Sequence, residues 1–223
     1  MRFFLAGLCL GCIAGFAAAQ NVPRAKDGHP DLTGIWNPDG HYSGDFTKAL
    51  KAGDRISMLP GAAKVMKGRK KEDDPANRCL PMGIPRLSAD PQKFVQTPSQ
   101  IIILDEGDIH TFRIVYLNGR QHPAEVNPTW YGDSIGRWDG DTLVVDTVGF
   151  NDRTWLDAVG HPHTDKLHVT ERYVRPEMNT LSREVTVEDT GAYAKPFTLE
   201  GSFKLLVNRE IREHYCYTSP VDK

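Results

Sequence analysis

From Phe94 onward the chain is a succession of short segments in which apolar and polar residues alternate, and this pattern constrains the fold more than any other feature. Within 181–188, the apolar Leu181, Val185 and Val187 fall on one face of an extended segment, and the even-numbered polar residues fall on the other. The candidate strands are Phe94–Thr97, Ile101–Asp105, His110–Leu117, Ser134–Trp138, Thr142–Phe150, Leu167–Arg175, Leu181–Glu188 and Phe197–Val207. Turn-forming residues separate most of them, as at Asn118-Gly119 and Asp139-Gly140.

About eight strands with short connections and almost no helix predict an all-β domain. An open sheet would expose two unpaired edges, and closing it into a barrel removes both. We therefore expect an antiparallel, up-and-down β-barrel of the lipocalin-like kind, whose interior has room for one small ligand. A two-sheet sandwich without an interior cavity is the alternative fold.

The residues ahead of these strands have a different composition. Residues 20–60 are rich in Gly, Pro and Asp, and Asp31–Trp36 is their clear strand candidate. A short helix is expected from Gly61 to about Lys71. The loop Cys79–Arg86 that follows contains two prolines, which prevent regular structure. This region is expected to be an irregular extension that wraps over the barrel domain.

The N-terminal residues are typical of a secretory signal. Arg2 supplies a positive charge, Phe3–Phe16 is apolar, and Ala17–Ala19 fits a cleavage site. Because the apolar run is shorter than the roughly 20 residues that span a bilayer, we expect cleavage, a periplasmic or secreted location and no stable membrane insertion afterwards. An uncleaved anchor and a lipoprotein at Cys12 are the alternatives. The expected division is a signal peptide over 1–19, the N-terminal extension over 20–92 and the β-barrel domain over 93–223.

Charge and cysteine content narrow the class of protein. Loss of Arg2 on cleavage would change the net charge only from −2 to −3, and no long basic stripe is present, so nucleic acid is not an expected partner. The basic run Lys64–Lys71 is interpreted as a solvated helix surface. Cys79 and Cys216 remain after cleavage and are expected to form one long-range disulfide. The alternative is a thiolate nucleophile paired with a histidine.

Candidate catalytic residues concentrate between Trp155 and Arg172. His163 is the expected acid–base group because an imidazole titrates near neutral pH. Asp157 is its expected orienter. Arg172 suits a carboxylate or a developing oxyanion of a substrate. The upstream carboxylates of Asp133, Asp139 and Asp141 are interpreted as turn formers.

Substrate-binding candidates surround the same segment, and the list comprises Trp130, Trp155, His161 and Glu171. The tryptophans would stack on an aromatic ligand, and the alternative is that they fill the core. Glu171 and Arg172 are adjacent and point to opposite sides of a strand, so both can face the same ligand only if a β-bulge interrupts the alternation. A structural partner for Glu171, such as Arg183 on the next strand, is the alternative.

A metal site is a further possibility, because His161, His163, Asp157 and Asp165 are close in sequence and suit zinc or copper. Their spacing is not specific, and Pro162 interrupts the histidine pair. An exposed polar loop is the third interpretation. The chain has no Gly-x-Ser-x-Gly elbow, Walker loop, dinucleotide fingerprint or Cys-x-x-Cys pair. We therefore expect no cofactor and assign no metal ligand.

The run Trp130–Thr147, with Trp155-Leu-Asp157, His161-Pro-His163 and Glu171-Arg172-Tyr173, resembles a family of uncharacterised secreted bacterial proteins. Its pattern is Trp-x-Gly-Asp-Ser-Ile-Gly-x-Trp-(Glu/Asp)-Gly-Asp-Thr-Leu-Val-Val. The likeness extends to Pro30–Trp36, to Cys79–Arg86 and to a late cysteine, and so covers most of the mature chain. The resemblance implies export and one domain, and it implies no particular reaction.

These observations predict an exported enzyme that performs cofactor-independent acid–base chemistry, of the lyase, decarboxylase or isomerase type, on a small apolar or aromatic compound. A non-catalytic periplasmic binding protein for an apolar ligand is one alternative, and a zinc or copper metalloprotein is the other. The expected partner is a small molecule, and the oligomeric state stays open.

Overall fold

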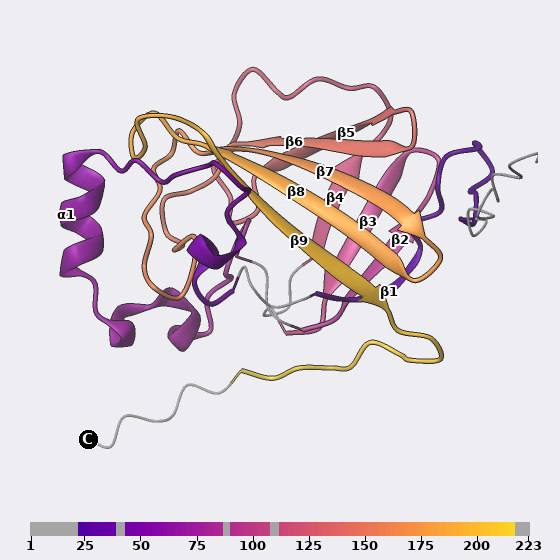
Figure 1. Ribbon diagram of the computed structural model, residues 1–223, viewed down its shortest axis with the longest axis horizontal. Coiled ribbons are helices and arrows are strands. Elements are labelled where there is room, and N and C mark those ends of the chain that lie inside the picture. The colour runs from indigo at the N-terminus through magenta and orange to yellow at the C-terminus, as the bar shows by residue number, and fades with distance from the viewer. Residues whose placement is uncertain (1–21, 39–42, 87–89, 108–111, 217–223) are drawn as a thin grey trace, which may run out of the picture.

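Nine β-strands close into one barrel within the residues that the computed structural model describes, which are 22–38, 43–86, 90–107 and 112–216 (Figure 1). The signal peptide expected over 1–19 lies outside these residues. The strands are β1 (Gly34–Pro38), β2 (Gln92–Gln96), β3 (Gln100–Asp105), β4 (Phe112–Tyr116), β5 (Asp133–Asp139), β6 (Thr142–Val148), β7 (His168–Glu177), β8 (Thr180–Glu188) and β9 (Phe197–Leu205). The expected all-β barrel is confirmed, and its ninth strand is β1, which overlaps the candidate Asp31–Trp36.

The barrel departs from a fully antiparallel one at a single seam among the described strands. β4 and β5 are parallel and share two residue pairs, Val115 with Ser134 and Tyr116 with Ile135. A parallel pair needs a connection that returns along the length of the strands. Here the connection is the crossover loop, Leu117–Gly132, which contains no helix or strand and arches above β5 and β6 in Figure 1.

The barrel interior contains one of two apolar clusters. Trp36, Phe94, Leu143 and Phe203 are completely or almost completely buried there, and they come from strands that lie far apart in sequence. Burial of side chains of this size provides most of the driving force for closing the barrel, at about 1.5–3 kcal/mol each.

The second apolar cluster lies under the loops at one end of the barrel. Phe46 stacks on Phe197 with 5.3 Å between ring centroids, and Tyr193 packs edge-on against the same ring at 5.1 Å. Leu156 and Phe150, from the loop after β6, complete this cluster and are buried. The cluster thereby attaches that loop firmly to the barrel end.

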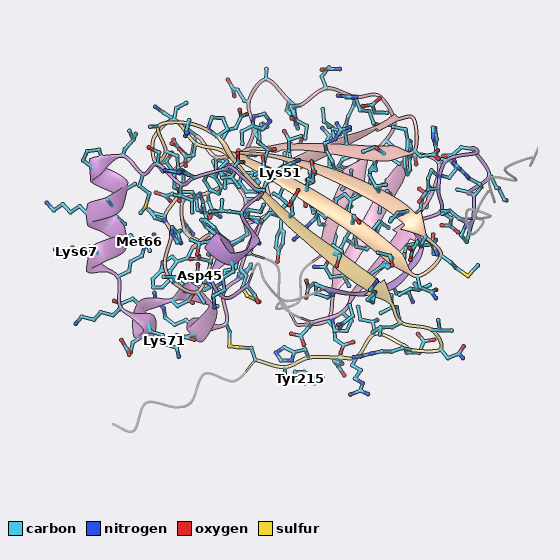
Figure 2. All side chains as sticks on the ribbon, viewed as in Figure 1. Asp45, Lys51, Met66, Lys67, Lys71 and Tyr215 are labelled. Atoms are coloured by element: carbon cyan, nitrogen blue, oxygen red, sulfur yellow. A yellow bond between two sulfur atoms is a disulfide. The ribbon has the colours of Figure 1, made fainter. Side chains whose placement is uncertain are left out.

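The N-terminal extension contributes a helix and three short 3-10 turns. Helix α1 (Pro60–Gly68) begins one residue before the expected helix and ends earlier, and η2 (Lys71–Asp73) and η3 (Pro75–Arg78) follow it; η1 (Phe46–Ala49) lies ahead of it. Lys67 and Lys71 are exposed, in keeping with a solvated basic surface (Figure 2). None of the helices described is long and apolar enough to cross a membrane.

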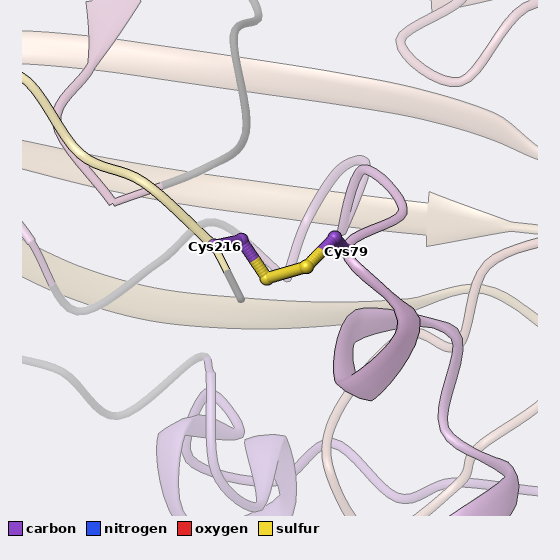
Figure 3. Close-up of a disulfide and its surroundings, with 2 residues drawn as sticks. All are labelled: Cys79 and Cys216. Carbon is purple, nitrogen blue, oxygen red and sulfur yellow. A yellow bond between two sulfur atoms is a disulfide. The ribbon is translucent and has the colours of Figure 1, made fainter. Parts of the chain in front are cut away.

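A disulfide joins Cys79 to Cys216, with 5.7 Å between the Cα atoms, as expected from the cysteine content (Figure 3). It links the C-terminal tail to the residue that follows η3. Nearby, Arg86 forms two hydrogen bonds to Asp74, at 2.8 and 2.7 Å, and both side chains are buried. The irregular extension is therefore joined covalently to the C-terminal tail and held together internally by a buried ion pair.

Candidate functional site

An open cleft of about 770 Å³ lies where the β6–β7 loop (Gly149–Leu167) meets the end of the crossover loop. Residues of its wall include Thr129, Trp130, Asp152, Arg153, His163 and Asp165. A β-barrel of this kind could bind a small ligand, and the cleft provides space for one.

His163 is the predicted catalytic residue that lines this cleft, and its side chain is largely buried. Nε2 lies 2.7 Å from Oγ1 of Thr154, and Nδ1 lies 3.1 Å from the backbone oxygen of Thr164. A carbonyl oxygen only accepts, so in the neutral ring Nδ1 carries the proton. Nε2 then accepts the hydrogen bond from the Thr154 hydroxyl.

The protonation state of His163 follows from its surroundings. Burial lowers the pKa of His163 below its ordinary value of 6.5, and it outweighs the Thr164 carbonyl and the Asp189 carboxylate, which act in the opposite direction. The ring is therefore neutral near pH 7. The Nε2 lone pair of the neutral imidazole can accept a proton, and the Thr154 hydroxyl already donates a hydrogen bond to it.

Two side chains, those of Asp189 and Tyr193, hold the residues on either side of His163. Asp189, which follows β8, accepts hydrogen bonds from the backbone nitrogen and the hydroxyl of Thr164 at 2.6 and 2.7 Å. The hydroxyl of Tyr193 donates to the Pro162 carbonyl at 2.7 Å. The imidazole is thus held in position before any ligand binds.

Asp157 contacts His161 and not His163, so its expected role as the orienter of His163 has no counterpart in the structure. Oδ2 of Asp157 accepts a 2.7 Å hydrogen bond from Nδ1 of His161, and Oδ1 accepts from three backbone N–H groups, those of Val159, Gly160 and His161. Asp157 closes the loop on itself, and the Thr164 carbonyl takes the orienting position at His163.

The other ring-bearing substrate candidates separate in space. Trp130 lines the cleft. Trp155 is buried, and the Arg69 guanidinium lies 4.8 Å from the centre of its ring while also donating to the Gly160 carbonyl. His161 is buried against Phe46, at 4.3 Å between centroids. Of Trp130, Trp155 and His161, Trp130 is the one positioned to stack on a ligand in the cleft.

Glu171 points into the barrel and Arg172 points outward, as their adjacent positions require. The Glu171 carboxylate is fully buried, with Oε2 2.5 Å from Arg113 and Oε1 3.5 Å from Arg183. The structural pairing with Arg183 is therefore present. Arg172 lies half-exposed on the outer face, 3.3 Å from Asp139. Neither side chain belongs to the cleft wall.

The buried ion network fills the barrel interior. Tyr173 donates a 2.8 Å hydrogen bond to Glu171, and Arg113 donates to Ser134 and Thr147 at 3.0 and 2.8 Å. Burial opposes ionisation of Glu171, but the two arginines and the Tyr173 hydrogen bond outweigh it and hold the pKa below its ordinary value. Burial and then the Glu171 charge raise the pKa of Tyr173 to about 12.

The space beside this network is small. A cavity of about 10 Å³, lined by Gln92, Arg113 and Tyr173 among others, has room for about one water molecule. Charged and aromatic side chains line this cavity, and the cleft at the barrel end offers a larger space.

Sequence reasoning misses Thr154 and the role of His122. Thr154 is buried beside His163 although it is nine positions away, and its distance from the histidine motif gives no signal. His122 bridges the carboxylates of Asp133 and Asp146 on the outer face. The turn-forming role expected of Asp133 is replaced by a contact with this distant histidine.

Among the residues described, no group of three or more His, Cys, Asp or Glu side chains is arranged to hold a metal ion. No protein-family model, curated protein or solved structure matches the chain.

Proposed function

We propose that the protein is an enzyme that catalyses proton transfer on a small ligand bound in the cleft, in a reaction of the lyase, decarboxylase or isomerase type. The observation that carries this proposal is the pair formed by neutral, buried His163 and the Thr154 hydroxyl. A buried imidazole kept neutral near pH 7 is suited to accept a proton from a ligand.

The proposed step uses the two ring nitrogens of His163 differently. Nε2 takes a proton from the ligand, either directly after the Thr154 hydroxyl turns away or through that hydroxyl. Nδ1 keeps its hydrogen bond to Thr164, which stabilises the imidazolium that forms. Trp130 offers an aromatic surface for the ligand, and Arg153 supplies the positive charge that the sequence suggests for Arg172.

The ligand class follows from the cleft wall. Trp130 and Phe150 favour an aromatic or otherwise apolar part, and Arg153 favours a carbonyl or carboxylate group on it. We also propose that the protein works after export into an oxidising compartment, as its family resemblance implies. The disulfide between Cys79 and Cys216 supports this part of the proposal.

Exchange of carbon-bound hydrogen for deuterium tests the proposal, and the test requires no identified product. Acetophenone and phenylpyruvate are incubated with the protein in D2O, and loss of their α-hydrogen signals is followed by proton NMR. The native protein should accelerate the exchange. His163→Gln should slow it by about 100-fold or more, and Thr154→Val by about tenfold.

His214→Gln is the matched control, because His214 is exposed in the C-terminal tail. It should exchange at the native rate, and circular dichroism should show that all variants fold. Exchange that is unaffected by His163→Gln contradicts the proposed base. If both probes shift the Trp130 indole signal and neither exchanges, the protein is a non-catalytic binding protein for aromatic ligands.

A further inference from the structure

The crossover loop, Leu117–Gly132, is long for a connection without secondary structure, and loops of this kind are usually functional. Its second half is attached by backbone hydrogen bonds: Thr129 donates to Gly149 at 3.0 Å and accepts from Asn151 at 2.8 Å. Its first half is attached by a backbone hydrogen bond from Leu117 to Ser99 at 2.7 Å and, beyond that, by side chains. Arg120 stacks on Tyr116 at 4.1 Å and pairs with Asp133.

His122 fixes the same half of the loop to the outer face of the barrel. Its Nδ1 lies 2.6 Å from Oδ1 of Asp133 on β5, and its Nε2 lies 2.8 Å from Oδ1 of Asp146 on β6. The contacts continue across the neighbouring strands of the sheet. His168 on β7 places Nε2 2.7 Å from Oδ2 of Asp146 and Nδ1 3.1 Å from Glu188 on β8. We call Arg120, Asp133, His122, Asp146, His168 and Glu188 the outer charge row.

The geometry of the outer charge row matches histidines that are protonated on both ring nitrogens. Both nitrogens of His122, and both of His168, face carboxylate oxygens that only accept. A neutral imidazole has one N–H and one lone pair, so its lone pair would face a negative oxygen. With both rings protonated, three cations balance three anions along the row. Arg137 on β5 is the further charged residue in the groove between this row and the loop.

We propose that the outer charge row is a pH-sensitive clamp, which holds the first half of the crossover loop to the barrel while His122 is protonated and releases it when His122 loses that proton. Deprotonation turns one charge-assisted hydrogen bond into a lone-pair repulsion and leaves the row with an excess of negative charge. Arg120 still pairs with Asp133 at the start of this half, so the segment beyond it is the part that is released. It therefore opens locally while the barrel stays folded.

Asp133 and Asp146 are held in their charged form by the cations around them. Burial opposes ionisation of Asp146, but hydrogen bonds from His168 and His122 outweigh it and hold the pKa of this carboxyl below 3.8. The pKa of Asp133 is lowered in the same way by Arg120 and His122 against burial. The clamp is accordingly closed while the imidazoles carry both protons, since each ring nitrogen then donates to a carboxylate.

The clamp has a consequence for the cleft, and that consequence rests on the proposed function. Val126 packs against Gly149, and the loop then forms the cleft wall at Thr129 and Trp130. When the first half of the loop is released, this wall keeps the backbone hydrogen bonds of Thr129 but loses the support of the segment that precedes it. A rise in pH should thus loosen the cleft on the Trp130 side.

Hydrogen–deuterium exchange of the full chain without ligand tests the clamp, so its result does not depend on whether His163 is catalytic. Protection factors for peptides within 117–127, corrected for intrinsic exchange, are compared at about pH 5.5 and about pH 8.5. We expect protection to fall by about tenfold or more at the higher pH. Peptides from β8 should keep their protection.

His122→Gln is the informative variant, and His214→Gln is its matched control because His214 is exposed in the tail. His122→Gln should show low protection within 117–127 at both pH values, and His214→Gln should repeat the native profile. Protection in the native chain that does not change with pH overturns the proposal, and so does a native-like drop in His122→Gln. If that variant does not fold, nitrogen-15 shifts of native His122 decide: a neutral ring at about pH 5.5 overturns the clamp.

Discussion

Arg113 on β4 and Glu171 on β7 form an ion pair inside the barrel, with 2.5 Å between Nη2 and Oε2 and both side chains almost completely buried. The two strands are separated in the sheet by β5 and β6, so the pair spans the interior. Hydrogen bonds from Arg113 to Ser134 and Thr147, and from Tyr173 to Glu171, hold both partners of the pair in place.

Replacing Arg113 with Met should lower the free energy of unfolding by about 3–5 kcal/mol, because Glu171 would keep a buried charge with one arginine fewer. Urea unfolding followed by tryptophan fluorescence measures the loss. Arg172→Gln, whose ion pair with Asp139 is exposed, is the comparison and should change stability by less than about 1 kcal/mol. If both variants lose a similar amount of unfolding free energy, the buried Arg113–Glu171 pair does not stabilise the fold more than the exposed pair does.

Alanine substitutions at Gly132 and Gly140 distinguish two costs: the strain of a left-handed backbone, which both would have, and steric crowding of the new Cβ, which only Gly132 would have. Their φ angles are +67° and +59°. A Cβ on Gly132 would lie 2.5 Å from the Val148 carbonyl oxygen, whereas a Cβ on Gly140 would meet no atom within 4 Å. Gly140→Ala should cost about 1–2 kcal/mol, and Gly132→Ala should cost about 1–3 kcal/mol more. Thermal unfolding of the two variants checks the order, and a larger loss for Gly140→Ala contradicts it.

Acid should weaken the β6–β7 loop through Asp157. Burial opposes ionisation of Asp157, but hydrogen bonds from His161 and the backbone outweigh it, so the pKa lies below 3.8. A carboxyl with a depressed folded-state pKa stabilises the fold above its unfolded value and loses that contribution as pH falls through the folded value. Native stability should therefore decline below about pH 4.

Asp157→Asn isolates this contribution. It should cost about 1–3 kcal/mol near pH 7 and show a shallower decline in acid, because the amide does not titrate. Urea unfolding between about pH 2 and 7 measures both effects. Asp165→Asn, on the same loop and exposed, is the control and should follow the native profile. If the free energy of unfolding of Asp157→Asn falls in acid as steeply as that of the native protein, the decline is caused by other carboxyl groups.

Local sequence pattern predicts the strands because burial on one face of a strand imposes a two-residue period. The candidate Leu181–Glu188 corresponds to β8, which begins one residue earlier, and Thr142–Phe150 corresponds to β6, which ends two residues sooner. The parallel seam between β4 and β5 is not predictable in this way. Alternation specifies which face of a strand is buried, and it does not specify the direction of its neighbour.

The candidate site is predictable only in part. His163 lines the cleft, as its motif suggests, but its hydroxyl partner Thr154 is brought to it by the course of an irregular loop. His122 meets Asp146 only because the crossover loop lies across the outside of the barrel. Contacts of this kind depend on tertiary packing between distant segments, and residue spacing does not encode them.

The disulfide gives the last prediction. Cys79 begins the loop that reaches Gly83, where a Cβ would lie 3.1 Å from the Thr154 side chain. Replacing Cys79 and Cys216 with Ser should cost about 2–5 kcal/mol, because the unfolded chain is no longer cross-linked. Differential scanning calorimetry should give the same lower Tm for this variant and for the native protein treated with a reductant. Because Gly83 backs directly on Thr154, the proton–deuterium exchange that we propose for His163 should also fall in both samples. A reduced native protein with an unchanged Tm would mean that the non-covalent contacts of the extension, such as the Arg69 hydrogen bond to Gly160, are enough to hold it in place.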